Sequence, residues 1–167
     1  KFNNVVTSPN AKYRFYSPRQ QYDDYRFDGR DSGLPESSWR EASAANIKET
    51  MAILNKKDLF GGTDWRWAFK TAMNLKPAPD VIFFMTDGTG GNDPGTILDY
   101  NDRNGKAQLN TFAMQTQAGA GEMQEIAKKS GGKFTIILGA GKTVDGDDYF
   151  EDTTKWDREI NKVKPKK

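Results

Sequence analysis

VIFFMTDG, residues 81–88, is the stretch that decides the fold of this 167-residue chain. Five apolar residues, Val81 to Met85, lie between the Pro-rich residues 77–80 and a Gly-rich stretch that begins at Gly88. A continuous apolar run of this length, bounded by turn residues, is typical of a strand that is buried on both faces. We therefore predict a central strand over Val81–Thr86.

An ionisable side chain, Asp87, follows this strand directly. Open α/β sheets place their ligand sites at the rim above the carboxyl ends of the strands, so Asp87 is the first candidate for a functional residue. The alternative is that Asp87 only caps the following turn through its own backbone, as aspartate does in many loops. On this stretch alone both interpretations stay open.

The composition limits the classes of function. A chain of this length can bury one core, and we predict a single partial domain over residues 1–163 with a basic tail at 164–167. The 25 basic and 23 acidic residues give a net charge of only +2, which does not predict nucleic-acid binding. The chain has no Cys and no His, so a bound metal would need oxygen ligands. It also has no apolar run of about 18 residues that could span a membrane.

Local patterns give the remaining elements. Two short β-prone runs separated by Ser8-Pro9-Asn10 predict an antiparallel pair at a sheet edge. Ser38 and Glu41 form a capping-box pattern that predicts the start of a helix. From Thr63 onwards strands and helices alternate, which predicts an α/β fold with a parallel sheet and right-handed crossovers. The predicted strands are 2–7, 11–16, 81–86, 108–114 and 133–138, and the predicted helices are 39–55, 63–75, 121–130 and 149–163, with a short helical turn within 97–106.

Residues 19–35 show neither a helical nor a strand period, and we predict a long loop there. Aromatic and Arg side chains alternate with acids in this loop. We expect an ordinary surface loop first and a protein contact second, with Tyr22, Tyr25, Arg26 and Phe27 as the candidate contact residues. The acids in the same loop argue against stacking on single-stranded nucleic acid.

Two short motifs are set aside. Gly139 to Thr143 resembles the end of a phosphate-binding loop, but the first glycine of that pattern would fall on Ile136 and no helix is predicted to follow. The acids at 145, 147 and 148 lack the invariant glycine of a calcium-binding loop, and we predict a solvated acidic loop instead.

Two segments carry a family resemblance, Gly61-Gly62-Thr63-Asp64 and Met85-Thr86-Asp87-Gly88. Together with FNNVVTS, GGTDWRWAFKTAMNLKP, PDVIFFMTDG, LNTFAM and GEMQEIAKKSGGKFTII, in this order and spacing, they resemble the von Willebrand factor A domain, and within that family its bacterial members. The resemblance implies a Rossmann-like fold with a divalent cation at the sheet rim. Thr63 matches the family's metal-binding threonine and Asp87 its aspartate, and both offer oxygen ligands that suit Mg²⁺.

The sequence departs from the family pattern in one respect. It contains no D-x-S-x-S motif, and the strand and helix that should precede Phe2 are missing. The resemblance places that strand in the middle of the sheet, between residues 2–7 and 81–86. Its absence would leave unpaired backbone groups that cost about 1 to 3 kcal/mol each when buried. We therefore expect a segment outside this chain to fill the gap, either the protein's own amino-terminal piece or a strand of a neighbouring subunit.

The expected fold is thus Rossmann-like, with a mostly parallel central sheet, an antiparallel edge, helices on both faces and the first, central strand absent. The expected function is a non-enzymatic adhesion or assembly module whose Mg²⁺ accepts an acidic group of a protein partner. The alternative is a structural subunit of a filament or envelope assembly with a vestigial metal site. An enzyme is the weakest option, because the chain lacks a nucleophile and base pair and offers only the acids Asp93, Asp99 and Asp102 near the rim.

Overall fold

The computed structural model describes residues 39, 41–55, 65–88 and 93–163. These residues divide into two units, which are treated separately: the first holds residues up to 55 and 67–79, and the second holds 65–66 and 80–163. The predicted strands 2–7 and 11–16, the loop 19–35 with Tyr22, Tyr25, Arg26 and Phe27, the residue Thr63 and the tail 164–167 lie outside the described residues.

The first unit contains α3 (Ala44–Asn55), which starts later than predicted. The backbone N–H of Asn46 donates to the side-chain oxygen of Ser43 (3.2 Å), so Ser43 caps the helix and the predicted start at residue 39 is wrong. The side chains of Ile47 and Met51 on this helix are 49% and 51% exposed. The predicted helix is therefore present, but these two apolar residues are not buried.

The next helix, α4 (Trp65–Met73), lies within the predicted range 63–75. Its buried residues Trp65, Phe69 and Met73 recur every fourth position, which places them on one side of the helix. Trp65 belongs to the second unit, where its ring meets the ring of Phe84 edge to face at 5.7 Å.

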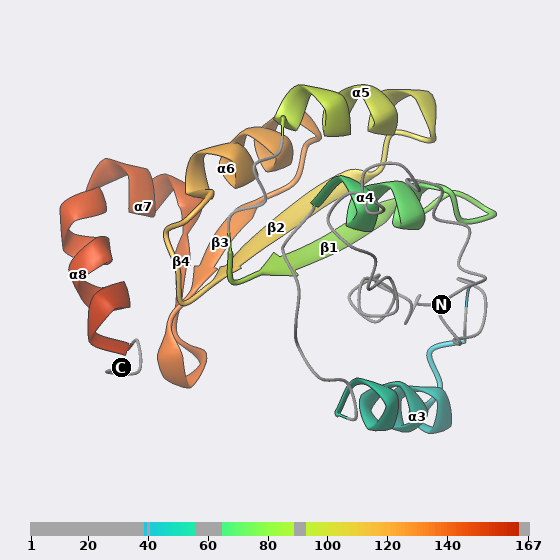
Figure 1. Ribbon diagram of the computed structural model, residues 1–167, viewed down its shortest axis with the longest axis horizontal. Coiled ribbons are helices and arrows are strands. Elements are labelled where there is room, and N and C mark those ends of the chain that lie inside the picture. Colours follow the sequence, from blue (N-terminus) through green and yellow to red (C-terminus); the bar gives the residue numbers. More distant parts are fainter. Residues whose placement is uncertain (1–38, 40, 56–64, 89–92, 164–167) are drawn as a thin grey trace, which may run out of the picture. The chain divides into compact units, whose positions relative to one another are not determined.

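A four-stranded sheet forms the centre of the second unit (Figure 1). Its strands lie in the order β1 (Val81–Thr86), β2 (Gln108–Met114), β3 (Phe134–Ile137) and β4 (Thr143–Asp145). The first three are parallel, with Val81 opposite Gln108 and Thr111 opposite Phe134, and β4 runs antiparallel to β3. The prediction of an α/β fold with a mostly parallel sheet is confirmed. The antiparallel edge strand in the described sheet is β4, which the sequence did not predict.

The connecting helices are α5 (Pro94–Arg103), α6 (Ala120–Lys129), α7 (Gly146–Glu151) and α8 (Thr153–Val163), and a 3₁₀ turn occupies Gly139–Gly141. Helix α5 is longer than the predicted turn, because Asp93 caps it and Pro94 takes its first position. The predicted acidic loop is instead β4 followed by α7, and the predicted helix 149–163 is interrupted at Asp152.

One face of the sheet is buried beneath helices. It carries Ile82 and Phe84 from β1 and Leu109, Thr111 and Ala113 from β2, all buried. The hydroxyl of Thr111 donates to the backbone oxygen of Met123 in α6 (2.9 Å). Helix α6 therefore covers this face of β2.

The opposite face is open over β1 and the end of β2. Val81, Phe83 and Met85 are 41%, 61% and 55% exposed, and Met114 is 42% exposed. The expected burial of this strand on both faces is therefore wrong, because burial alternates along β1, which lies at the end of the strand order of the described sheet. The expected fold also has helices on both faces of the sheet. In the described part of the second unit, no helix covers the exposed face of β1.

Candidate functional site

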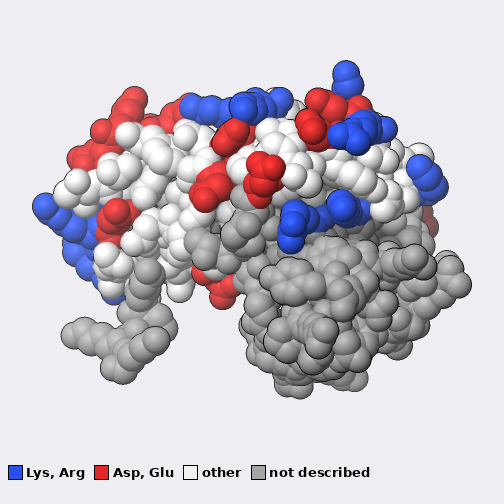
Figure 2. Space-filling view, turned by 45° about the horizontal axis from the view of Figure 1, so that its top comes forward, with Lys and Arg blue, Asp and Glu red and all other residues white. Residues whose placement is uncertain are grey.

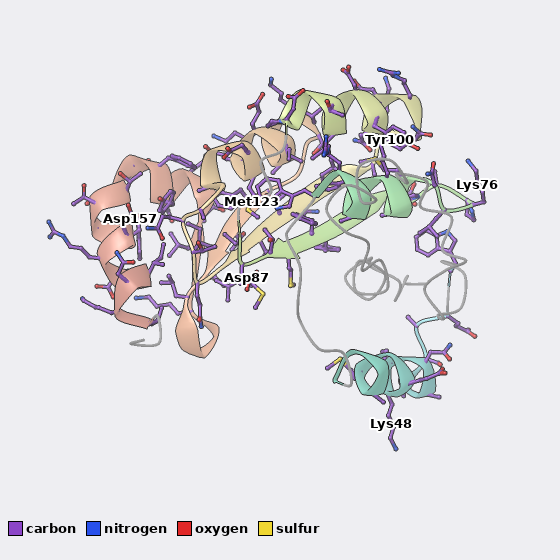
Figure 3. All side chains as sticks on the ribbon, in the orientation of Figure 1. Lys48, Lys76, Asp87, Tyr100, Met123 and Asp157 are labelled. Carbon is purple, nitrogen blue, oxygen red and sulfur yellow. The ribbon has the colours of Figure 1, made fainter. Side chains whose placement is uncertain are left out.

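The candidate site lies at the carboxyl end of β1, where Figure 3 shows Asp87 as the chain leaves the strand. Thr86, the last residue of the strand, is buried, and Asp87 is exposed. The pleat explains the difference, because successive side chains of a strand point to opposite faces. The carboxylate of Asp87 therefore lies at the rim of the sheet, as predicted.

The turn after β1 is closed by Thr86. Its hydroxyl donates to the backbone oxygen of Gly88 (3.1 Å) and accepts from the backbone N–H of Gly88 (3.2 Å). Among the described residues, no hydrogen bond or ion pair holds the carboxylate of Asp87. The interpretation of Asp87 as the cap of this turn is therefore not supported, since its neighbour fulfils that role.

The outer edge of β1 adjoins this carboxylate. The N–H of Gln108 donates to the backbone oxygen of Asp80 (2.8 Å). Because a parallel ladder uses alternate residues, the even-numbered residues of β1 face β2, and Val81, Phe83 and Met85 direct their N–H and C=O groups to the outer edge. No strand of the described part of the chain pairs there.

The metal ligands can be judged only in part. Within the described ranges no group of three or more acidic, His or Cys side chains could hold a metal ion. Of the two predicted metal ligands, only Asp87 lies among the described residues, because Thr63 lies outside them. One accessible carboxylate fits Mg²⁺, which keeps several waters and is commonly bound through one or two carboxylates. The remaining protein ligands would have to come from outside the described residues.

The acids that could have formed a catalytic cluster are spread along α5. The carboxylate of Asp93 caps the helix and accepts hydrogen bonds from the hydroxyl of Thr96 (3.0 Å) and the N–H of Gly95 (2.9 Å), and these bonds lower its pKa. Asp99 lies 3.5 Å from Arg103 one turn further on. Asp93 and Asp99 thus stabilise the helix, and their positions do not support a catalytic pair of acid and base.

The segment that resembled a phosphate-binding loop is the turn of a hairpin. The N–H of Leu138 donates to the oxygen of Lys142 (2.7 Å), and β4 then pairs antiparallel with β3. Within the acidic run that follows, Asp145 caps α7 through the N–H of Asp147 (3.0 Å). Asp147 also pairs with Lys128, which lowers the pKa of this aspartate. The predicted solvated loop is therefore wrong, because these acids start a helix.

Sequence reasoning missed Gln115, which follows β2 at the same rim. Its φ of 54° lies in the left-handed region, which is uncommon for a residue other than glycine, and its N–H donates to the oxygen of Ile137 (2.8 Å). Glutamine does not signal this conformation, so no pattern could have identified it. Gln115 is exposed and is a further candidate for this rim.

The described residues on one face of the molecule show no continuous basic patch of the kind that a polyanion partner would need. On the face shown in Figure 2, acidic and basic side chains are interspersed over the described residues. None of the described helices combines the length and the apolar character needed to cross a membrane.

Comparison of the chain with protein-family models, with curated proteins and with solved structures gave no match. The resemblance to the von Willebrand factor A domain therefore rests on the sequence motifs, and the activity it implies is a proposal.

Proposed function

We propose that this chain is a non-enzymatic protein-binding module for adhesion or assembly, with a divalent-cation site at the rim of its sheet. The observation that carries the proposal is the carboxylate of Asp87, which is exposed at the carboxyl end of β1 and has no hydrogen-bond or ion-pair partner among the described residues. Crevices at the strand ends of α/β sheets are the usual ligand sites of such folds.

Asp87 would supply one oxygen ligand to Mg²⁺, and Thr63 a second through its hydroxyl. The ion would offer an open position to an acidic group of a protein partner, which its preference for oxygen ligands favours. The other protein ligands belong to a segment outside this chain, which also supplies the strand next to β1. The unpaired outer edge of β1 in the described sheet supports this second part.

Binding of Mn²⁺, a paramagnetic substitute for Mg²⁺, tests the cation site. We expect titration of the ¹⁵N-labelled chain to broaden the amide signals of Asp87 and Gly88 first, with a dissociation constant of about 1 mM, because one carboxylate and waters make a weak site. Excess Mg²⁺ should restore the signals. Asp87→Asn should abolish the effect, because an amide oxygen carries no charge.

The matched control is Asp80→Asn, since Asp80 is an exposed aspartate at the amino end of the same strand. It should leave the broadening at Asp87 unchanged. Equal broadening near every exposed carboxylate, or an unchanged titration of Asp87→Asn, would rule out a cation site at this rim.

The alternative function is a structural subunit that assembles through its sheet. The exposed apolar residues of β1 favour it, because obligate assembly surfaces are apolar, and so does the outer edge of β1, which no strand of the described residues pairs with. Metal dependence separates the two functions. If chelation or Asp87→Ala leaves partner binding unchanged while substitutions in β1 or in the loop 19–35 abolish assembly, the structural function holds.

A further inference from the structure

Three turns in the described part of the chain contain an Asn or Asp residue that is followed directly by Gly. They are Asp87-Gly88, Asn104-Gly105 and Asp145-Gly146. In such a dipeptide the backbone nitrogen of the glycine can attack the side-chain carbonyl carbon of the preceding residue, because glycine has no side chain that obstructs a close approach. Asparagine is the thermolabile member of the pair, since its amide nitrogen leaves as ammonia. The contacts of the three turns differ.

Two of these turns are held in place by their neighbours. The N–H of Gly88 donates to the hydroxyl of Thr86 (3.2 Å), a residue that is itself buried. The carboxylate of Asp145 caps α7, and Gly146 lies so close to Phe134 that an added Cβ would be 2.6 Å from the ring. Both turns therefore have to open before the glycine nitrogen reaches the side chain.

The turn after α5 lacks such restraints. Gly105 is exposed, and its N–H has no hydrogen-bond partner among the described residues. Its φ of 125° lies in the region that favours glycine. The side chain of Asn104 is held by one hydrogen bond, in which its amide nitrogen donates to the backbone oxygen of Tyr100 (2.7 Å), the residue labelled in Figure 3. Helix ends open at little cost, so this bond is a weak restraint on the reaction.

We propose that Asn104 is a site of spontaneous deamidation in the folded protein. The nitrogen of Gly105 loses its proton to a base of the solvent and forms a bond to Cγ of Asn104. The bond between Cγ and Nδ2 then breaks, and Nδ2 takes up a proton and leaves as ammonia. A cyclic imide remains, and water opens it at either carbonyl to give aspartate or isoaspartate. The net reaction consumes water and releases ammonia, with no oxidation or reduction.

Deamidation replaces a hydrogen-bond donor by a negative charge at the end of α5. The new carboxylate cannot donate to the oxygen of Tyr100, and it lies at the carboxyl end of a helix, where the helix dipole disfavours an anion. The reaction therefore weakens the last turn of α5. It is independent of the proposed function, because the carboxylate of Asp87 takes no part in it.

Peptide mapping by mass spectrometry of the folded full chain, incubated at mildly alkaline pH, tests the site. Asp87→Asn and Asp145→Asn are the matched controls, since each places the same Asn-Gly dipeptide in one of the two held turns, and asparagine also caps helices. We expect the amide of Asn104 to be lost at least tenfold faster than the amide that either substitution introduces. In the chain unfolded in urea, the three amides should be lost at similar rates.

Two results would overturn the proposal. One is loss of the three amides at equal rates in the folded chain, because the contacts of the turns would then not select Asn104. The other is loss of the Asn104 amide more than tenfold slower in the folded chain than in the unfolded chain, because the fold would then protect this residue.

Asn104→Asp mimics one product and tests the effect on the helix. The lost hydrogen bond and the unfavourable charge should lower the melting temperature by roughly 2 to 8 °C. The matched control is Asn161→Asp, at an exposed asparagine in the last turn of α8, which adds the charge without removing a hydrogen bond between described residues. It should have no more than half the effect. Equal melting temperatures of the two variants would overturn the proposed weakening of α5.

Discussion

The link between α5 and β2 depends on Asn101, and its removal gives a prediction that can be worked out from the structure. This side chain is 4% exposed. Its amide nitrogen donates to the backbone oxygen of Ala107 (2.8 Å), and its amide oxygen accepts from the backbone N–H of Ala107 (3.0 Å). Because Ala107 is buried as well, Asn101 is the partner that satisfies both backbone groups just before β2 starts.

Asn101→Leu keeps most of the volume and removes both hydrogen bonds. Each buried backbone group left unpaired costs about 1 to 3 kcal/mol. Two such groups are left, and water that reaches the loop would lower the cost, so we expect the free energy of unfolding to fall by about 3 kcal/mol. For a chain of this length that loss corresponds to a decrease in melting temperature of roughly 6 to 12 °C. Urea unfolding followed by circular dichroism measures the change in the free energy of unfolding.

The control is Asp102→Leu, the same replacement at the exposed neighbour of Asn101. It should change the free energy of unfolding by less than about 0.5 kcal/mol, as is usual for surface positions. If Asn101→Leu costs no more than this control, the two hydrogen bonds do not hold the link, and the reasoning fails.

Two further predictions concern packing and titration in the second unit. Gly132→Ala would place a Cβ 2.0 Å from the backbone oxygen of Leu109, so we expect the free energy of unfolding to fall by at least about 3 kcal/mol or the chain not to fold. The control is Gly121→Ala, which has no atom within 4 Å and should be neutral or stabilising by up to about 1 kcal/mol. Equal effects of the two variants in a denaturant titration would contradict this prediction. Burial and the hydrogen bond to Asp157 raise the pKa of Tyr149 to about 12. A raised pKa means that stability is complete below pH 10 and is lost as the pH rises towards 12, a slope that Tyr149→Phe should remove in unfolding curves measured across that range.

Much of the second unit could be predicted from the sequence because its signals are local. The predicted strands 81–86 and 108–114 and the predicted helix 121–130 agree with β1, β2 and α6 within one residue. The misses also have local causes. The dipeptide Asp93-Pro94 was read as part of a Gly-rich loop, although an aspartate cap followed by proline is a helix start.

The candidate site was predictable only in part. The position of Asp87 follows from one rule, that the carboxyl ends of strands form the rim, and the structure agrees with it. The sequence could not show that the carboxylate of Asp87 takes no part in closing the turn. The hydroxyl of Thr86 and the carboxylate of Asp87 are both able to accept the hydrogen bonds that close such a turn. Only the hydrogen bonds between Thr86 and Gly88 decide between the two.

The strand β1 carries the clearest difference between sequence and structure. Its sequence is apolar at every position from Val81 to Met85, whereas an antiparallel or half-solvated strand would alternate apolar and polar residues. In the described sheet its burial does alternate, with Phe84 covered and Phe83 mostly exposed. An apolar residue gains stability only where it leaves water, at about 25 cal/mol per Å². Phe83 and Met85 therefore contribute little to the stability of the described arrangement, and their apolar character would be accounted for only if a further segment covered them.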